Sequence, residues 1–209
     1  MQKAIRELVQ SKTCRSSEVG IDASGNESRT ALEAAADSQA SDSDDPPSSH
    51  VNLSVNSCGV ELSLRTADTD PPMAGYVDRL LAHASAIANA GRGSLNVAIV
   101  DDPQMARLHK QYKGIDGSTD VLTFDLRPSA TAPLEADIVI CLDVAKRQAA
   151  KRGHPARTEV LLYALHGLLH LLGMDDDEPA KALAMHERED EILTAIGVGP
   201  VYQVSEGSR

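Results

Sequence analysis

The sequence has 209 residues, of which 42% are hydrophobic but only 2% are aromatic, with no Trp and a single Phe. A chain of this length can bury a core, but Leu, Val, Ile and Ala must build it, and stacking platforms for single-stranded nucleic acid are scarce. The formal net charge of -11 argues against a uniformly basic nucleic-acid binder, and three Cys without Cys-x-x-Cys spacing exclude a disulfide framework and a thiolate zinc site.

The charge is distributed unevenly along the chain. Basic residues outnumber acidic ones between residues 105 and 157, whereas acidic residues dominate from residue 158 onward. The middle of the chain can therefore meet phosphate, although an ordinary solvated surface explains the same charges equally well. No stretch approaches the roughly 18 apolar residues of a membrane span, and the N-terminus lacks an apolar signal segment. We expect a soluble cytoplasmic protein with no membrane partner.

In chain order, the first segment is rich in Ser, Ala, Asp and Glu and shows no sustained apolar period. It offers too little apolar surface to offset the entropy of ordering, so we predict a disordered acidic tail at residues 1–50. A single folded domain is expected at residues 51–200, followed by a flexible C-terminus at residues 201–209.

Within this domain, apolar periodicity and the positions of Gly and Pro predict a mixture of strands and helices. Strands are expected at residues 51–55, 94–100, 121–124 and 138–142, and helices at residues 73–87, 102–112, 143–151, 157–172 and 179–196. This order indicates an α+β fold, a single small domain with a mixed sheet of about four strands packed with helices.

The strongest predicted helix carries His166 and His170, which lie four residues apart and therefore on one face. Two imidazoles at this spacing can reach one metal ion, whereas a lone His on an apolar helix is more often a hydrogen-bonded core residue. Gly173 can turn the chain back after the helix, and Asp175, Asp176 and Asp177 follow it. These carboxylates near the negative end of a helix dipole are better explained by a nearby cation, although a solvated acidic turn is the simpler alternative.

The pattern differs from the His-Glu-x-x-His motif of zinc proteases, because Gly167 stands where the general base would be. It resembles the His-Gly-x-x-His-Leu-x-Gly-x-Asp-His signature of the YbeY family of rRNA maturation endoribonucleases. Further segments in matching order are the run from Leu108 to Phe124, the strand Ala136-Asp-Ile-Val-Ile-Cys141 and the closing helix from Met185 to Gly197.

The resemblance implies a metal-dependent endoribonuclease specific for single-stranded RNA, acting in late 16S rRNA 3′-end maturation and ribosome quality control. It implies the small ribosomal subunit as partner and no DNA. The expected metal ligands are His166, His170 and Asp176, with Asp175 and Asp177 as weaker candidates. His166 and Lys113 are the expected catalytic residues, and Lys113 and Arg147 are expected to bind substrate.

Two positions depart from the family pattern. Asp176 stands where the family has a third His, so zinc is expected but a harder ion such as Mn²⁺ gains preference. Lys113 stands where the family has an Arg, which keeps the charge but loses the bidentate fork for phosphate. These departures keep two alternatives open: a ribosome assembly factor whose metal is structural and whose cleavage is negligible, and a metal hydrolase of another substrate.

Overall fold

The computed structural model describes residues 53–57, 60–66 and 71–202. The expected tail at residues 1–50 lies outside the described residues, as do residues 203–209 of the expected flexible C-terminus. Five helices and five strands are described, in this order: β1 (Leu53–Ser57), β2 (Val60–Thr66), α2 (Pro71–Ile87), β3 (Gly93–Val100), α3 (Asp102–Lys113), β4 (Val121–Asp125), β5 (Leu134–Cys141), α4 (Leu142–Arg152), α5 (Ala156–Leu171) and α6 (Pro179–Ala195).

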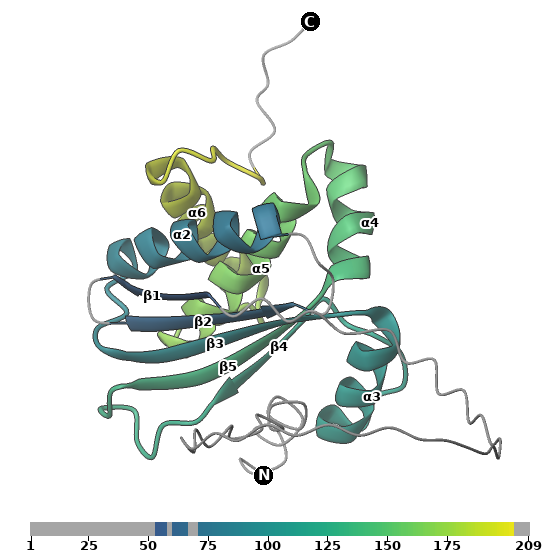
Figure 1. Ribbon diagram of the computed structural model, residues 1–209, viewed down its shortest axis with the longest axis horizontal. Coiled ribbons are helices and arrows are strands. Elements are labelled where there is room, and N and C mark those ends of the chain that lie inside the picture. Colours follow the sequence, from purple (N-terminus) through teal and green to yellow (C-terminus); the bar gives the residue numbers. More distant parts are fainter. Residues whose placement is uncertain (1–52, 58–59, 67–70, 203–209) are drawn as a thin grey trace, which may run out of the picture. The chain divides into compact units, whose positions relative to one another are not determined.

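The strands form one mixed sheet in the order β1-β2-β3-β5-β4 (Figure 1). Strands β2, β3 and β5 run parallel, whereas β1 and β4 are antiparallel to their neighbours at the two edges. The predicted α+β class with a mixed sheet is confirmed. The sheet has five strands where about four were expected, and β2 is the strand that was not predicted. This strand pairs with β1 in a register that leaves two residues between Ser57 and Val60.

Successive side chains of each strand point to opposite faces of the sheet, and apolar side chains cover both faces. The larger core contains Leu95, Val97 and Ile99 of β3 together with buried residues of β5, α2, α5 and α6. The opposite face is covered by α3, whose Met105 and Leu108 pack with Leu122, Val139 and Cys141. Helix α5 is buried along most of its length in the larger core, as its continuous Leu and Ala content predicts. Among the described residues, no helix is both long and apolar enough to cross a membrane.

Gly167 brings α5 close to the sheet. A Cβ atom at this position would lie 2.7 Å from Thr123 Oγ1 and 2.9 Å from Ile138 Cδ1. From the sequence, Gly167 was expected to be unable to act as a base and to allow another backbone to approach closely. In the structure it lets the helix that carries both His residues pack directly against β4 and β5.

We expect Gly167→Ala to lower the free energy of unfolding, because overpacking of about 1–3 kcal/mol exceeds the gain in helix propensity. Gly75→Ala is the matched control: Gly75 is an exposed position in α2 where a Cβ meets nothing within 4 Å. That change should stabilise the protein by about 0.5–1 kcal/mol. Denaturant unfolding measures both, and equal shifts of the same sign would contradict the close packing at Gly167.

Candidate metal centre

His166 and His170 project from the last turns of α5, where the helix leaves the core. Their neighbours Leu165, Leu168 and Leu169 are buried. The two imidazole side chains keep 19% and 30% of their surface exposed. The predicted arrangement on one helix face is therefore present, at the border between core and solvent.

Each imidazole is held through its Nδ1 atom. His166 Nδ1 lies 2.8 Å from a carboxylate oxygen of Glu189, and His170 Nδ1 lies 3.1 Å from the backbone oxygen of Met174. Both partners accept hydrogen bonds, so each Nδ1 donates and each neutral ring keeps a lone pair on Nε2. The two Nε2 atoms lie 3.0 Å apart. Two lone pairs at this distance repel each other unless a proton or a metal ion lies between them.

Asp176 completes a group of three donors. Its Oδ1 lies 3.6 Å from His170 Nε2 and its Oδ2 lies 3.7 Å from His166 Nε2. Bonds of about 2.0–2.2 Å to a tetrahedral zinc ion separate the ligand atoms by about 3.3–3.6 Å. The observed separations bracket this range, so these residues fit one divalent ion and leave further coordination positions for substrate. The described residues contain no other group of three metal-binding side chains this close together.

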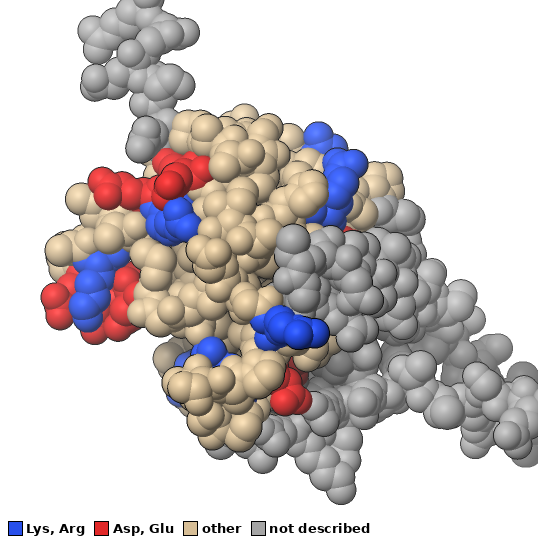
Figure 2. All heavy atoms as spheres, turned by 90° about the vertical axis from the view of Figure 1, so that its left-hand side faces the viewer, with Lys and Arg blue, Asp and Glu red and all other residues tan. Residues whose placement is uncertain are grey.

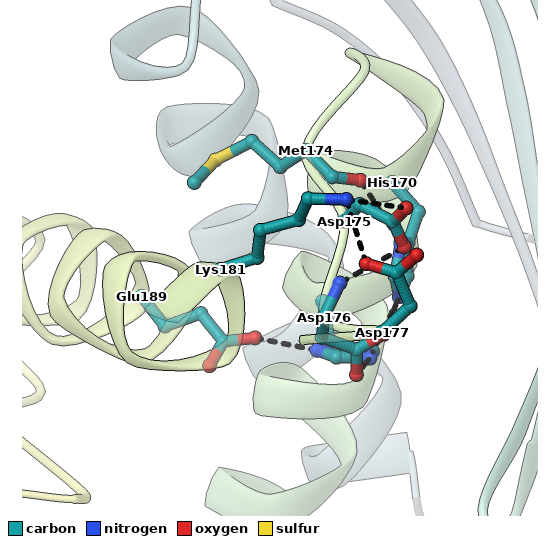
Figure 3. A network of polar contacts seen from close by, with 8 residues as sticks. His170, Met174, Asp175, Asp176, Asp177, Lys181 and Glu189 are labelled. Atoms are coloured by element: carbon teal, nitrogen blue, oxygen red, sulfur yellow. Dashed lines mark hydrogen bonds and ion pairs between the residues drawn. The ribbon is translucent and has the colours of Figure 1, made fainter. Parts of the chain in front are cut away.

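Asp175 and Asp177 are held away from this group by Lys181 of α6 (Figure 3). The ammonium group of Lys181 lies 2.8 Å from Asp177 Oδ1 and 3.7 Å from Asp175 Oδ2. Asp175 also accepts a hydrogen bond from the backbone N–H of Asp176. Of the three consecutive aspartates, only Asp176 therefore lies against the two imidazoles.

Glu189 contacts His166 and was not among the site residues predicted from the sequence. It is fully buried on α6, and it belongs to the same helix face as Met185, Ile192 and Leu193. Burial alone lowers the pKa of His166, but the hydrogen bond and charge of Glu189, with smaller effects of Asp176 and Asp120, raise this pKa above its ordinary value. A Glu at a core position of an amphipathic helix was the available signal, because such a charge needs a buried partner.

The three donors open into a cavity of about 490 Å³. Its lining residues come from α3, from the segment leading into β4, from β4 itself, from α5 and from the acidic loop: Lys113, Asp120, Val121, Leu122, Thr123, Asp125, His166, His170, Leu171 and Asp176. Lys113 is exposed and forms no ion pair with any described residue. The structure therefore places a cation in the same cavity as the His and Asp donors.

Arg147 does not line this cavity. Its guanidinium group donates two hydrogen bonds, of 2.6 and 3.1 Å, to the carboxylate of Asp102 at the start of α3. These bonds and the charge of Arg147, together with hydrogen bonds from Cys141 and Ser118, hold the pKa of Asp102 well below its usual range. The structure thus gives Arg147 a role in joining α3 to α4, and its role in substrate binding stays a prediction.

Residues 65–197 match the family model described as Endoribonuclease YbeY, and this segment contains every residue that lines the cavity. The chain is 35% identical over 154 residues to the Endoribonuclease YbeY of Moorella thermoacetica, covering 66% of this chain and 99% of that protein. It is 38% identical over 121 residues to the Endoribonuclease YbeY of Halorhodospira halophila, covering 56% and 79%. The solution structure of TM1509 from Thermotoga maritima aligns with a TM-score of 0.47 and 21% identity, covering 72% of this chain and 99% of that chain.

Proposed function

This chain belongs to the YbeY family of endoribonucleases, and we propose that it cuts single-stranded RNA in the cavity that contains His166, His170 and Asp176. The observation that carries the proposal is the fit of these three donors to one divalent ion beside the ammonium group of Lys113 in the same cavity. Zinc is the proposed ion. The carboxylate of Asp176 makes Mn²⁺ the alternative, because an oxygen atom as the third ligand favours harder ions.

In this proposal, one group of cavity residues binds the ion and Lys113 binds the RNA phosphate. When bound, the ion would supply Lewis acidity where negative charge develops on the phosphate. His166 and His170 offer their Nε2 atoms to it because both Nδ1 atoms are occupied by acceptors. Lys113 attracts the phosphate and offsets its developing charge. As a point charge, it orients the phosphate less strictly than a guanidinium group would.

The physiological substrate that we propose is the 3′ end of 16S rRNA during late maturation. The small ribosomal subunit would be the partner, in the cytoplasm, and the same activity would serve ribosome quality control. Support for this assignment comes from the family resemblance alone.

Cleavage assays with purified protein test the proposal. We expect a single-stranded RNA to be cut, the same sequence annealed to its complement to resist, a chelator to stop cleavage, and added Zn²⁺ or Mn²⁺ to restore it. Analysis of the product ends separates attack by the ribose 2′-hydroxyl, which leaves a 2′,3′-cyclic phosphate, from attack by water. Metal-replete protein that leaves the RNA intact would refute the nuclease proposal and favour a ribosome assembly factor with a structural metal.

A further inference from the structure

Strand β4 is an edge of the sheet, because its only partner among the described strands is β5 (Figure 1). An edge strand presents backbone N–H and C=O groups that no neighbouring strand satisfies. Four of the ten residues that line the cavity belong to this strand. The free edge and the three metal-binding side chains therefore open into the same space.

The register identifies which groups of β4 point outward. The backbone N–H of Cys141 donates to the oxygen of Asp120, and that of Leu126 donates to the oxygen of Glu135. Opposite residues of an antiparallel pair alternate between bonded and non-bonded positions. With Val121 opposite Ile140 and Asp125 opposite Ala136, positions 122 and 124 bond to β5, and positions 121, 123 and 125 face away from it.

Thr123 is the central residue of this outer row, and no other described strand pairs with its N–H and C=O. The N–H of Val121 is already taken by the side chain of Asp120 at 2.8 Å, and Asp125 is the last residue of the strand, where its carboxylate accepts from Arg127. Thr123 stands between them, with its side chain against Gly167 of the helix that carries both His residues. Its outward N–H donor and C=O acceptor thus lie at the centre of the strand that borders the metal-binding donors.

The cavity offers few other ways to hold an RNA base. Its lining includes no Phe, Tyr or Trp, and the ring of Phe124 packs edge-on against Tyr112 in the core on the α3 side. On the face shown in Figure 2, charged side chains of the described residues form small groups separated by uncharged surface. Stacking on an aromatic ring of Phe, Tyr or Trp in the lining is therefore a weak candidate for recognition here.

We propose that an unpaired base of the RNA docks its Watson–Crick edge on the outward N–H and C=O of Thr123. This inference rests on the proposed function and names a subsite of that same cavity. Every RNA base carries a donor next to an acceptor on this edge, so the contact tolerates all sequences. In a duplex the edge is already paired. The contact therefore supplies a physical reason for a preference for single strands.

Modified oligonucleotides test the contact on the unaltered protein. Oligouridylate with a methyl group on N3 keeps its phosphates and single-stranded state but loses the donor of the Watson–Crick edge. The control carries its methyl group on C5, away from that edge. In fluorescence anisotropy with the metal-replete protein, we expect the N3-methyl RNA to bind about tenfold more weakly than both the control and unmodified RNA, because one hydrogen bond is lost and the C=O of Thr123 is left without its partner. Equal binding of all three would overturn the proposal.

Two variants place the effect at Thr123. Thr123→Pro removes the outward N–H, and proline is tolerated in an edge strand where that group faces away from the sheet. Thr123→Val has the same shape and keeps the N–H. We expect only the proline variant to lose affinity for unmodified RNA, and to bind unmodified and N3-methyl RNA alike. A proline variant that unfolds like the native protein and still discriminates between the two RNAs would refute the assignment to Thr123.

The test of the base contact measures RNA binding and not RNA cleavage. The base contact and the nuclease activity can therefore be refuted independently of each other. A protein that prefers unmodified RNA but never cuts it would support the base contact and refute the nuclease. A protein that cuts N3-methyl and unmodified RNA equally well, with equal affinity, would support the nuclease and refute the base contact.

Discussion

Replacement of His166 by Ala should remove the bound metal and lower the rate of RNA cleavage by at least about 10²–10³-fold, the loss typical when a group that stabilises developing charge is deleted. The structure gives two reasons for so large an effect. His166 Nε2 lies 3.0 Å from His170 Nε2 and 3.7 Å from Asp176 Oδ2, so its loss would leave the group with a single imidazole. His166 is also the ligand that Glu189 holds from inside the core.

Metal content by mass spectrometry and cleavage of single-stranded RNA measure this result together. His83→Ala is the control, because His83 is exposed on α2 and does not line the cavity. It should keep both metal and activity. A His166→Ala protein with full metal content would contradict the ligand assignment, and one that lost its metal but cut RNA normally would contradict a catalytic role for the ion.

Much of the fold and of the site followed from patterns that are local in the sequence. Helical spacing placed His166 and His170 on one face, and the break after Leu172 brought Asp176 back to them, since these features need only α-helix geometry and a turn at Gly173. Gly173 adopts a φ of 95°, as such a turn requires. The motif around these residues also identified the family, which the comparisons confirmed.

The remaining features depend on contacts between segments far apart in the sequence. Glu189 meets His166 across 23 residues, and Arg147 meets Asp102 across 45. No periodicity within one element indicates which charged side chain will pair with which partner, so the pairing of Arg147 with Asp102 could not be predicted. The position of Thr123 on an edge strand of the described sheet could not be predicted for the same reason, because strand order is a property of the assembled sheet.

Glu189 carries a buried negative charge, and a metal ion held by the neighbouring His residues would compensate it. Its carboxylate is fully buried, one oxygen faces His166, and the other has no hydrogen-bond partner among the described residues. A buried charge of this kind opposes folding unless a cation is near. Carboxylates that accept from a ligating His fix its tautomer and increase its basicity toward the metal. We therefore expect Glu189 to contribute to metal binding and not to the stability of the core.

Glu189→Gln separates these two roles, because it keeps the shape and an acceptor for His166 Nδ1–H but removes the charge. We expect the dissociation constant for the metal to rise about 10–100-fold. The metal-free protein should lose no more than about 1 kcal/mol of stability, since a buried charge that lacks a full set of partners is removed. Competition with a chromogenic chelator and denaturant unfolding of the metal-free protein measure the two effects. Glu187→Gln, an exposed change on the same helix, should alter neither. If Glu189→Gln instead unfolds the metal-free protein and leaves metal affinity unchanged, Glu189 belongs to the core, and the orientation of His166 must come from elsewhere.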